Sequence, residues 1–302
     1  MPAAPHIRVY SHPATLEHQP GSGHPESPER VRTMLAALRR SPVAGRLEFT
    51  DAPAAERPAV ERVHPVAYLD RLERLAAAGG GILDADTVMS AGSFAAALHA
   101  AGAAVAAAAS ALGGVPAFAA VRPPGHHALA DRAMGFCLLN NVVIAARAAL
   151  HDHGLERVLI VDWDVHHGNG TQALVEREPR IRYVSLHQWP LYPGTGRADE
   201  RGVGNVFNVP RPPGRPRVEY VAALDAAVAR AAERWAPQLI LISAGFDAMA
   251  GDPLAGFTLE PEDYATWVAR WRGLDAPIAS VLEGGYEPRR IADAAIAHLG
   301  AL

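Results

Sequence analysis

Two carboxylates and an imidazole occupy alternate positions in one short segment of the sequence. Asp162, Asp164 and His166 lie in DWDVHHGNG, at the end of an apolar run. Residues at i, i+2 and i+4 of an extended chain project from the same face. Two carboxylates there would repel one another, or be badly desolvated, without a positive charge among them. The spacing therefore indicates a divalent cation, and Asp247 in a later polar loop could supply a third ligand.

The same segment also has a purely structural interpretation. Asp162 and Asp164 could cap a following helix while His166 packs at its start. The density of polar residues in DxDxHHGNG favours the metal site instead. The pair His126 and His127 follows Pro-Pro-Gly. We interpret this pair as a proton-transfer site beside the metal rather than as part of a solvated loop.

The elements that must position these residues alternate between short apolar runs and longer runs of helical period. This alternation predicts an α/β protein in which parallel strands are joined by crossover helices. We expect strands over Ile7–Tyr10, Ala117–Val121, Arg157–Asp162, Ile181–Leu186, Asn205–Val209, Gln238–Ser243 and Pro277–Leu282. We expect helices over Ser27–Arg40, Val60–Ala78, Ser93–Leu112, Leu138–His153, Arg217–Trp235, Pro261–Arg272 and Pro288–Leu299.

Polar residues follow five of these strands. The segments concerned are His126–His127, Asp162–Asn169, His187, Asp247–Asp252 and Glu283–Tyr286. Ligands bind at the carboxyl edge of an open parallel sheet, because the loops there are free to vary. We therefore expect these five strand ends to form one site.

Composition excludes several classes of protein. The chain has 302 residues, of which 28 are Arg, none is Lys and 32 are Asp or Glu, giving a formal charge of −4, so it is not a basic nucleic-acid binder. With 49% hydrophobic residues it is not disordered. The single cysteine, Cys137, excludes an internal disulfide and a Cys-rich zinc site. The N-terminus lacks the pattern of a signal peptide, which predicts a cytoplasmic protein. The Ala-rich stretch 91–112 is expected to be a buried helix rather than a membrane span.

Several blocks of the sequence together resemble the histone deacetylase family, and most of all its bacterial and class II branch. The blocks are RPPGHHA from Arg122, GFCLLNN from Gly135, VDWDVHHGNGTQ from Val161, SLH from Ser185, PGTG from Pro193, SAGFDA and GDPL between Ser243 and Leu254, and EGGY from Glu283. HPESPERV from His24 and DADTVMSAGS from Asp84 are similar to that family's early blocks. The resemblance covers nearly the whole chain.

The resemblance implies one domain over residues 1–302, with the arginase-deacetylase fold and a mostly parallel sheet of about eight strands. It implies Zn²⁺, with Fe²⁺ as the alternative, held by Asp164, His166 and Asp247. It also implies a K⁺ ion held by residues drawn from two neighbouring strand ends. These are Asp162, Asp164, His166, Ser185 and Leu186.

The resemblance further implies an amide hydrolysis in which His127, or His126 with it, takes a proton from water and Tyr286 stabilises the oxyanion. Asp162 would then support His126, and Asn169 would support His127. Because Asn169 is a neutral amide where some relatives carry Asp, we expect His127 to be neutral at pH 7 and to act as the base.

An acyl-lysine channel is implied by a further set of matching positions, which are Asp86, Gly135, Phe136, Tyr192 and Leu254. Phe136 and Tyr192 would be its aromatic walls, although each could be ordinary packing. Asp86 would hold the substrate backbone at the rim or would cap a helix. Leu254 stands where polyamine-selective relatives can carry an acidic residue, which favours acyl-lysine in peptides or proteins over acetylpolyamines.

Two other functions remain open at this stage. An arginase-type ureohydrolase shares the fold but needs two manganese ions and a longer set of carboxylates. A non-catalytic acyl-lysine binder could retain the zinc. We expect no nucleic-acid or membrane partner, while a homo-oligomer is compatible with the sequence.

Overall fold

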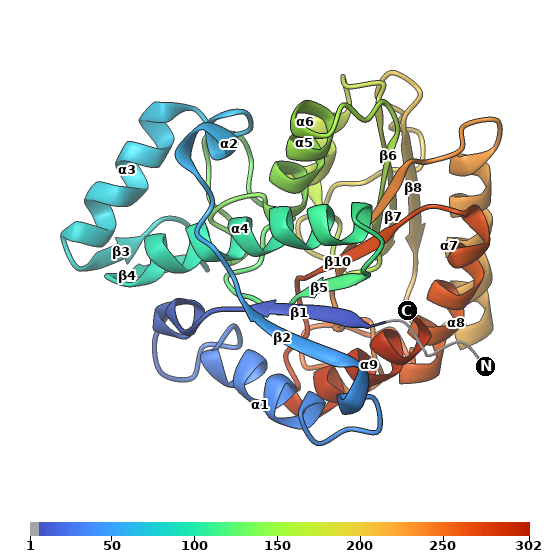
Figure 1. The fold of residues 1–302 in the computed structure, drawn as a ribbon, viewed down its shortest axis with the longest axis horizontal. Helices are drawn as coiled ribbons and strands as arrows, with labels where there is room; N and C mark the ends of the chain where they lie inside the picture. The colour runs from blue at the N-terminus through green and yellow to red at the C-terminus, as the bar shows by residue number, and fades with distance from the viewer. Residues whose placement is uncertain (1–5) are drawn as a thin grey trace.

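Eight parallel strands form the central sheet of the computed structural model, which describes residues 6–302 (Figure 1). Their order is β2-β1-β5-β10-β9-β6-β7-β8. The strands are β1 (Ile7–Ser11), β2 (Leu47–Asp51), β5 (Ala117–Ala119), β6 (Val158–Asp162), β7 (Ile181–Gln188), β8 (Val206–Arg211), β9 (Leu239–Ala244) and β10 (Ile278–Leu282). The α/β class and the sheet of about eight strands are confirmed.

Helices cover both faces of the sheet, as Figure 1 shows. One face carries α2 (Arg57–Glu61), α3 (Val66–Ala77), α4 (Ser93–Leu112), α5 (Asn141–Asp152) and α6 (Asn169–Val175). The other carries α1 (Pro28–Leu38), α7 (Arg217–Ala232), α8 (Pro261–Trp271) and α9 (Pro288–Ala301). Side chains of β6 alternate between the two cores: Val158 and Ile160 pack under the first set of helices, and Leu159 and Val161 under the second.

The five strands that end in polar residues are neighbours in the sheet. β5, β10, β9, β6 and β7 lie side by side in that order, although they come from widely separated parts of the chain. At the carboxyl end of β6, Asp162 pairs in register with Ser243 of β9 and with Ser185 of β7. The expected single site at one edge of the sheet therefore has the scaffold it needs.

Two of the expected elements differ in the structure. No strand was expected at β2, an edge strand in which only Leu47 is buried, so its sequence lacks the apolar run of the inner strands. The single helix expected over Val60–Ala78 is wrong: α2 ends at Glu61 and α3 begins at Val66. Pro65 separates the two helices, because proline disfavours helical backbone in the residue before it.

Smaller elements were also missed. The short helix α6 was not expected, nor was the antiparallel hairpin of β3 (Gly80–Ile82) and β4 (Val88–Ser90). Within residues 6–302, α4 is the one helix long and apolar enough to cross a membrane by composition. Its most apolar window is 61% buried, and it packs against α5, β5 and β10, as expected of a core helix.

Candidate active site

Two carboxylate side chains and one imidazole side chain meet at the carboxyl ends of β6 and β9. Asp164, His166 and Asp247 each offer one ligand atom, and these atoms lie within 4.8 Å of one another. His166 Nδ1 lies 3.1 Å from a carboxylate oxygen of Asp164 and 3.1 Å from one of Asp247. The structure thus brings together the three residues that the sequence suggested for the metal. In the described part of the chain, no other group of three such residues comes together in this way.

Two glycines make room for these carboxylates. A Cβ atom at Gly245 would lie 2.1 Å from Asp164 Oδ2, and one at Gly284 would lie 2.1 Å from Asp247 Oδ2. Gly284 also donates its N–H to Asp164 Oδ2 at 2.8 Å, and Val165 donates its N–H to Asp247 Oδ1 at the same distance. The backbone therefore approaches the carboxylates closely and fixes their orientation, which is what a metal site requires.

The three groups are buried together, and within residues 6–302 no arginine forms a salt bridge with Asp164 or Asp247. Burial and the neighbouring Asp164 raise the pKa of Asp247 to about 7. Although burial opposes it, hydrogen bonding to Asp164 and Asp247 raises the pKa of His166 to about 10. A cation stabilises the charged form of carboxylates that are buried side by side. The donor set, two oxygens and one nitrogen, suits a catalytic zinc ion.

The two adjacent histidines lie beside this group and have different partners. Their rings are 4.0 Å apart. His126 Nδ1 lies 3.1 Å from Asp162 Oδ2, whereas His127 Nδ1 lies 2.8 Å from Asn169 Oδ1. Both pairings are those that the resemblance implied. The Nδ1 atoms are assigned as the hydrogen-bond donors in these contacts, because an amide oxygen can only accept a hydrogen bond.

The surroundings shift the pKa values of the two imidazoles in opposite directions. Burial opposes the charged form of His126, but Asp164 and Asp162 raise its pKa well above the usual value. Burial, His126 and His166 lower the pKa of His127 well below that value. This lowered pKa favours the neutral form of His127, and a proton on Nδ1 facing Asn169 would leave Nε2 as the basic atom.

The backbone of the histidine loop is held by Glu283, at the end of β10. Its Oε2 accepts the N–H of Gly125 at 2.6 Å and that of His126 at 3.0 Å. Burial raises the pKa of Glu283 to about 7. This carboxylate couples the ends of β5 and β10, which are neighbours in the sheet.

A pocket of about 220 Å³ leads to the two histidines His127 and His166. Its other lining residues are Asp86, Gly135, Phe136, Leu191, Tyr192, Leu254 and Tyr286. All five residues expected to form the channel therefore line one pocket. Asp86 lies in the loop between β3 and β4, seven positions before α4 begins at Ser93, so the helix-cap interpretation of Asp86 is wrong.

The first aromatic wall of the pocket, Phe136, lies in a segment of left-handed backbone. Gly135 and Phe136 have φ values of +55° and +68°. A Cβ at Gly135 would lie 2.4 Å from the His127 ring, so this position needs glycine for both its conformation and its contact. Left-handed backbone is unfavourable for Phe136 because it has a side chain. The Phe136 N–H donates to Thr87 Oγ1 at 3.0 Å, which helps to hold this conformation. The second wall, Tyr192, lies edge-on to His127 at 5.2 Å.

Tyr286 faces Phe136 across the pocket, at 5.8 Å between ring centroids. Its N–H donates to Asp252 Oδ2 at 2.7 Å, while Asp252 Oδ1 accepts the N–H of Leu254 at 2.9 Å. One carboxylate therefore positions two residues that line the pocket. Within residues 6–302 the hydroxyl of Tyr286 makes no protein hydrogen bond, so it is free to donate to a bound ligand.

A buried network of charged residues lies behind the pocket, and its individual residues were not predicted from the sequence. Glu26 is fully buried and accepts hydrogen bonds from Arg30 and Arg122. Arg30 also donates to the carbonyl oxygens of Glu283 and Gly285, and its guanidinium lies 5.0 Å from the centroid of the Tyr286 ring. The block HPESPERV, which contains Glu26 and Arg30, was the available signal.

Of the residues expected to hold K⁺, Asp162 and Ser185 are register partners on neighbouring strands. Asp162 Oδ2 already accepts from Tyr183 at 2.9 Å, and Ser185 Oγ lies 2.9 Å from His187 Nδ1. The potassium site stays a prediction. Cys137 is a buried free thiol that donates to the Gly135 carbonyl oxygen at 3.3 Å.

Comparison with known proteins covers most of the chain. The histone deacetylase domain model matches residues 24–302. The chain is 40% identical over 296 residues to the histone deacetylase-like amidohydrolase of Pseudomonas aeruginosa, covering 94% of this chain and 78% of that protein. It is 38% identical over 302 residues to a probable deacetylase of Methanothermobacter thermautotrophicus, covering 97% and 90%. The crystal structure of the HDA15 HD domain superposes with a TM-score of 0.93 at 36% identity, covering 98% of this chain and 87% of that one.

Proposed function

Since the chain belongs to the histone deacetylase family and is a deacetylase or amidohydrolase with a buried Asp-His-Asp metal group, we propose that it removes acetyl or other short acyl groups from lysine side chains in peptides or proteins. The observation that carries this proposal is the pocket of about 220 Å³, which has aromatic walls and ends at His127, His166 and Tyr286. We propose Zn²⁺ as the metal, with Fe²⁺ as the alternative.

When bound by Asp164, His166 and Asp247, zinc supplies a Lewis acid and lowers the pKa of water. His127 lines the pocket with its ring 6.0 Å from that of His166, and its Nε2 is the atom left to accept a proton. It takes the proton of the attacking water as the new carbon–oxygen bond forms. When the carbon–nitrogen bond breaks, the same proton passes to the departing amine. Asn169 keeps the His127 ring in the tautomer that this transfer needs.

Tyr286 stabilises the negative charge that develops on the carbonyl oxygen. Its hydroxyl is free to donate a hydrogen bond, and Arg30 packs over its ring. A donor aimed at developing charge in a site with little water contributes strongly to the rate.

The walls of the pocket favour a lysine side chain. Its four methylene groups lose water between Phe136 and Tyr192, while the rest of the peptide stays outside. Leu254 adds apolar surface rather than charge. Asp86, the one carboxylate among the lining residues, favours a second candidate: it could meet a second ammonium group of an acetylpolyamine.

A panel of acetyl-lysine peptides, longer acyl-lysine peptides and acetylpolyamines tests the proposal, with acetate or acyl release measured at saturating zinc. We expect turnover of the peptides. Asp86→Asn should raise KM for acetylpolyamines far more than for peptides if the second candidate holds. Binding of a peptide without any release would indicate a non-catalytic binder. Release of urea from arginine or agmatine, with two metal ions per chain, would indicate a ureohydrolase.

The residue that separates catalysis from binding in this panel is Tyr286. Tyr286→Phe should reduce kcat by about 10²- to 10³-fold, because one oxyanion donor is lost. Zinc content by elemental analysis should be unchanged, since Tyr286 is not a ligand. Phe136→Leu is the matched control for packing: it alters the wall and KM but leaves the donor in place. Full activity of Tyr286→Phe would contradict the proposed role.

A further inference from the structure

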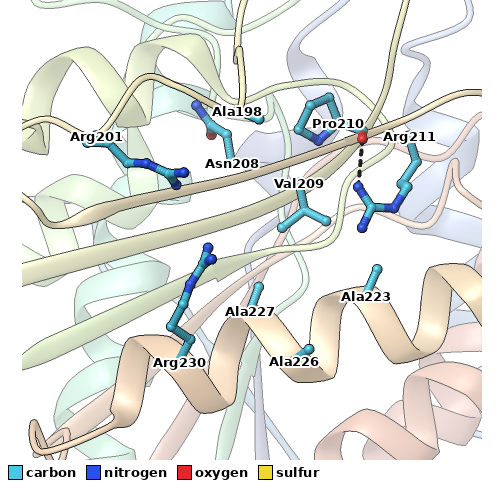
Figure 2. Close-up of a pocket in the computed structure, with 10 residues that line it drawn as sticks. All are labelled: Ala198, Arg201, Asn208, Val209, Pro210, Arg211, Ala223, Ala226, Ala227 and Arg230. Carbon is cyan, nitrogen blue, oxygen red and sulfur yellow. Dashed lines mark hydrogen bonds between the residues drawn. The ribbon is translucent and has the colours of Figure 1, made fainter.

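A second pocket, of about 280 Å³, lies between β8 and α7 and shares no lining residue with the channel. Figure 2 shows its floor of small side chains on α7, including Ala223 and Ala227, and its opposite wall along β8. Within the described residues 6–302, β8 pairs only with β7, so its outer edge has no strand partner among them. The small residues on α7 leave the space open.

Three arginines surround this space. Arg201 comes from the loop before β8, Arg211 from the end of β8 and Arg230 from α7. In Figure 2, Arg201 and Arg230 reach toward the same space from opposite walls, and Arg211 flanks it. Among the described residues that line this pocket, none is acidic.

None of the three guanidinium groups has an ion pair within residues 6–302. Arg211 donates only to the carbonyl oxygen of Pro210, at 3.0 Å. The acidic residues nearest to Arg201 in the chain have other hydrogen-bond donors: Asp199 accepts from Arg197, and Glu200 accepts from Gln172. Arg201 does help Arg197 to lower the pKa of Asp199, but it forms no salt bridge with that carboxylate. By contrast, Arg147 and Arg180 both pair with the carboxylate of Glu178.

The positions of the charges are also restrained. Arg230 lies over the Phe207 ring, at 5.3 Å from its centroid, a cation–π contact that limits its movement. Asn208 Nδ2 ties β8 to the carbonyl oxygen of Arg197 and to Gln172, which holds the loop that carries Arg201. Like charges held around one space repel one another unless an anion lies between them.

We propose that this pocket is a binding site for a phosphate group of a small metabolite. Guanidinium groups form paired hydrogen bonds with phosphate oxygens, and three of them match the charge of a phosphate dianion better than that of a single carboxylate. The site is separate from the deacetylase channel, so the proposal does not depend on the proposed function.

Calorimetric titration of the zinc-loaded full chain tests this site, with inorganic phosphate and a sugar bisphosphate as probes at fixed ionic strength. A hydroxamate occupies the metal during the titration, so that anions on the metal are not counted. We compare Arg230→Gln and Arg201→Gln with Arg40→Gln, which removes the same charge from an exposed arginine far from the pocket. Thermal melting checks that each variant is folded.

We expect saturable 1:1 binding that weakens about tenfold on loss of either pocket arginine and weakens as salt rises, while Arg40→Gln binds like the wild type. Equal affinity for the two probes would indicate that one free phosphate fills the site. Tighter binding of the bisphosphate would indicate a larger phosphorylated molecule. No saturable binding of either probe, or equal weakening in all three variants, would overturn the proposal.

Discussion

At the scale of single residues, two adjacent histidines have pKa values shifted in opposite directions because their surroundings differ. Asp164 and Asp162 raise the pKa of His126, whereas the amide of Asn169 orients His127 without adding charge. The resemblance to the histone deacetylase family implied both pairings. It could not show that Glu283 holds the backbone of the histidine loop, since that contact spans 157 residues and depends on tertiary structure.

Replacing the amide beside His127 tests this difference. Asn169→Asp places a carboxylate against Nδ1 and should raise the pKa of His127, since it stabilises the charged ring. The acidic limb of the pH profile of kcat/KM should then move upward by about one pH unit. Gln172→Glu is the matched control, because it adds the same charge beside His167 instead. An unmoved acidic limb in Asn169→Asp would exclude His127 as the base.

At the scale of elements, the inner strands were predictable and the outer ones were less so. Buried strands such as β6 and β9 are continuous apolar runs, whereas β2 is a half-exposed edge with little pattern. The break between α2 and α3 could have been predicted from Pro65. The hairpin β3–β4 was hidden by its glycines, yet its loop places Asp86 in the channel.

The connection between α5 and the turn before β7 depends on one partly buried carboxylate. Glu178 accepts hydrogen bonds from Arg147 and Arg180, and these lower its pKa to about 2. A lowered pKa stabilises the folded state above the unfolded value near 4.5, and this contribution is lost as the pH falls toward 2. Glu178→Gln should therefore reduce the free energy of unfolding by about 1–2 kcal/mol at pH 7, and by less at pH 3.5.

Urea denaturation at the two pH values measures this difference. Glu262→Gln is the control, because that carboxylate pairs with Arg217 while its side chain is 66% exposed. An exposed pair contributes little, so Glu262→Gln should change the stability by under about 0.5 kcal/mol. A Glu178→Gln effect that is the same at pH 7 and pH 3.5 would show that the charge is not its cause.

At the scale of the whole molecule, the order of the strands brings together residues that are far apart in the sequence, which no local pattern predicts. The ligands Asp164 and Asp247 are 83 residues apart in the sequence and meet because β6 and β9 are neighbours. Hydrophobic periodicity predicts strands but not their order. The expectation that five strand ends meet came instead from the polar residues that follow those strands. Both faces of the sheet carry extended cores, which leads us to expect one cooperative domain.

Removal of the metal should accordingly affect the stability of the whole sheet. A metal bound only by the folded chain adds about 4 kcal/mol at a thousandfold excess over its Kd, or about 6 °C in Tm for a domain of this size. Tryptophan fluorescence, dominated by the cluster of Trp163, Trp267 and Trp271, and far-UV circular dichroism should report one coincident transition with and without zinc. In Asp247→Asn the zinc-dependent shift should nearly vanish, because a ligand from β9 is lost while those from β6 remain. Separate transitions for the two probes would divide the chain into independent units, and an undiminished shift in Asp247→Asn would place the stabilising metal elsewhere.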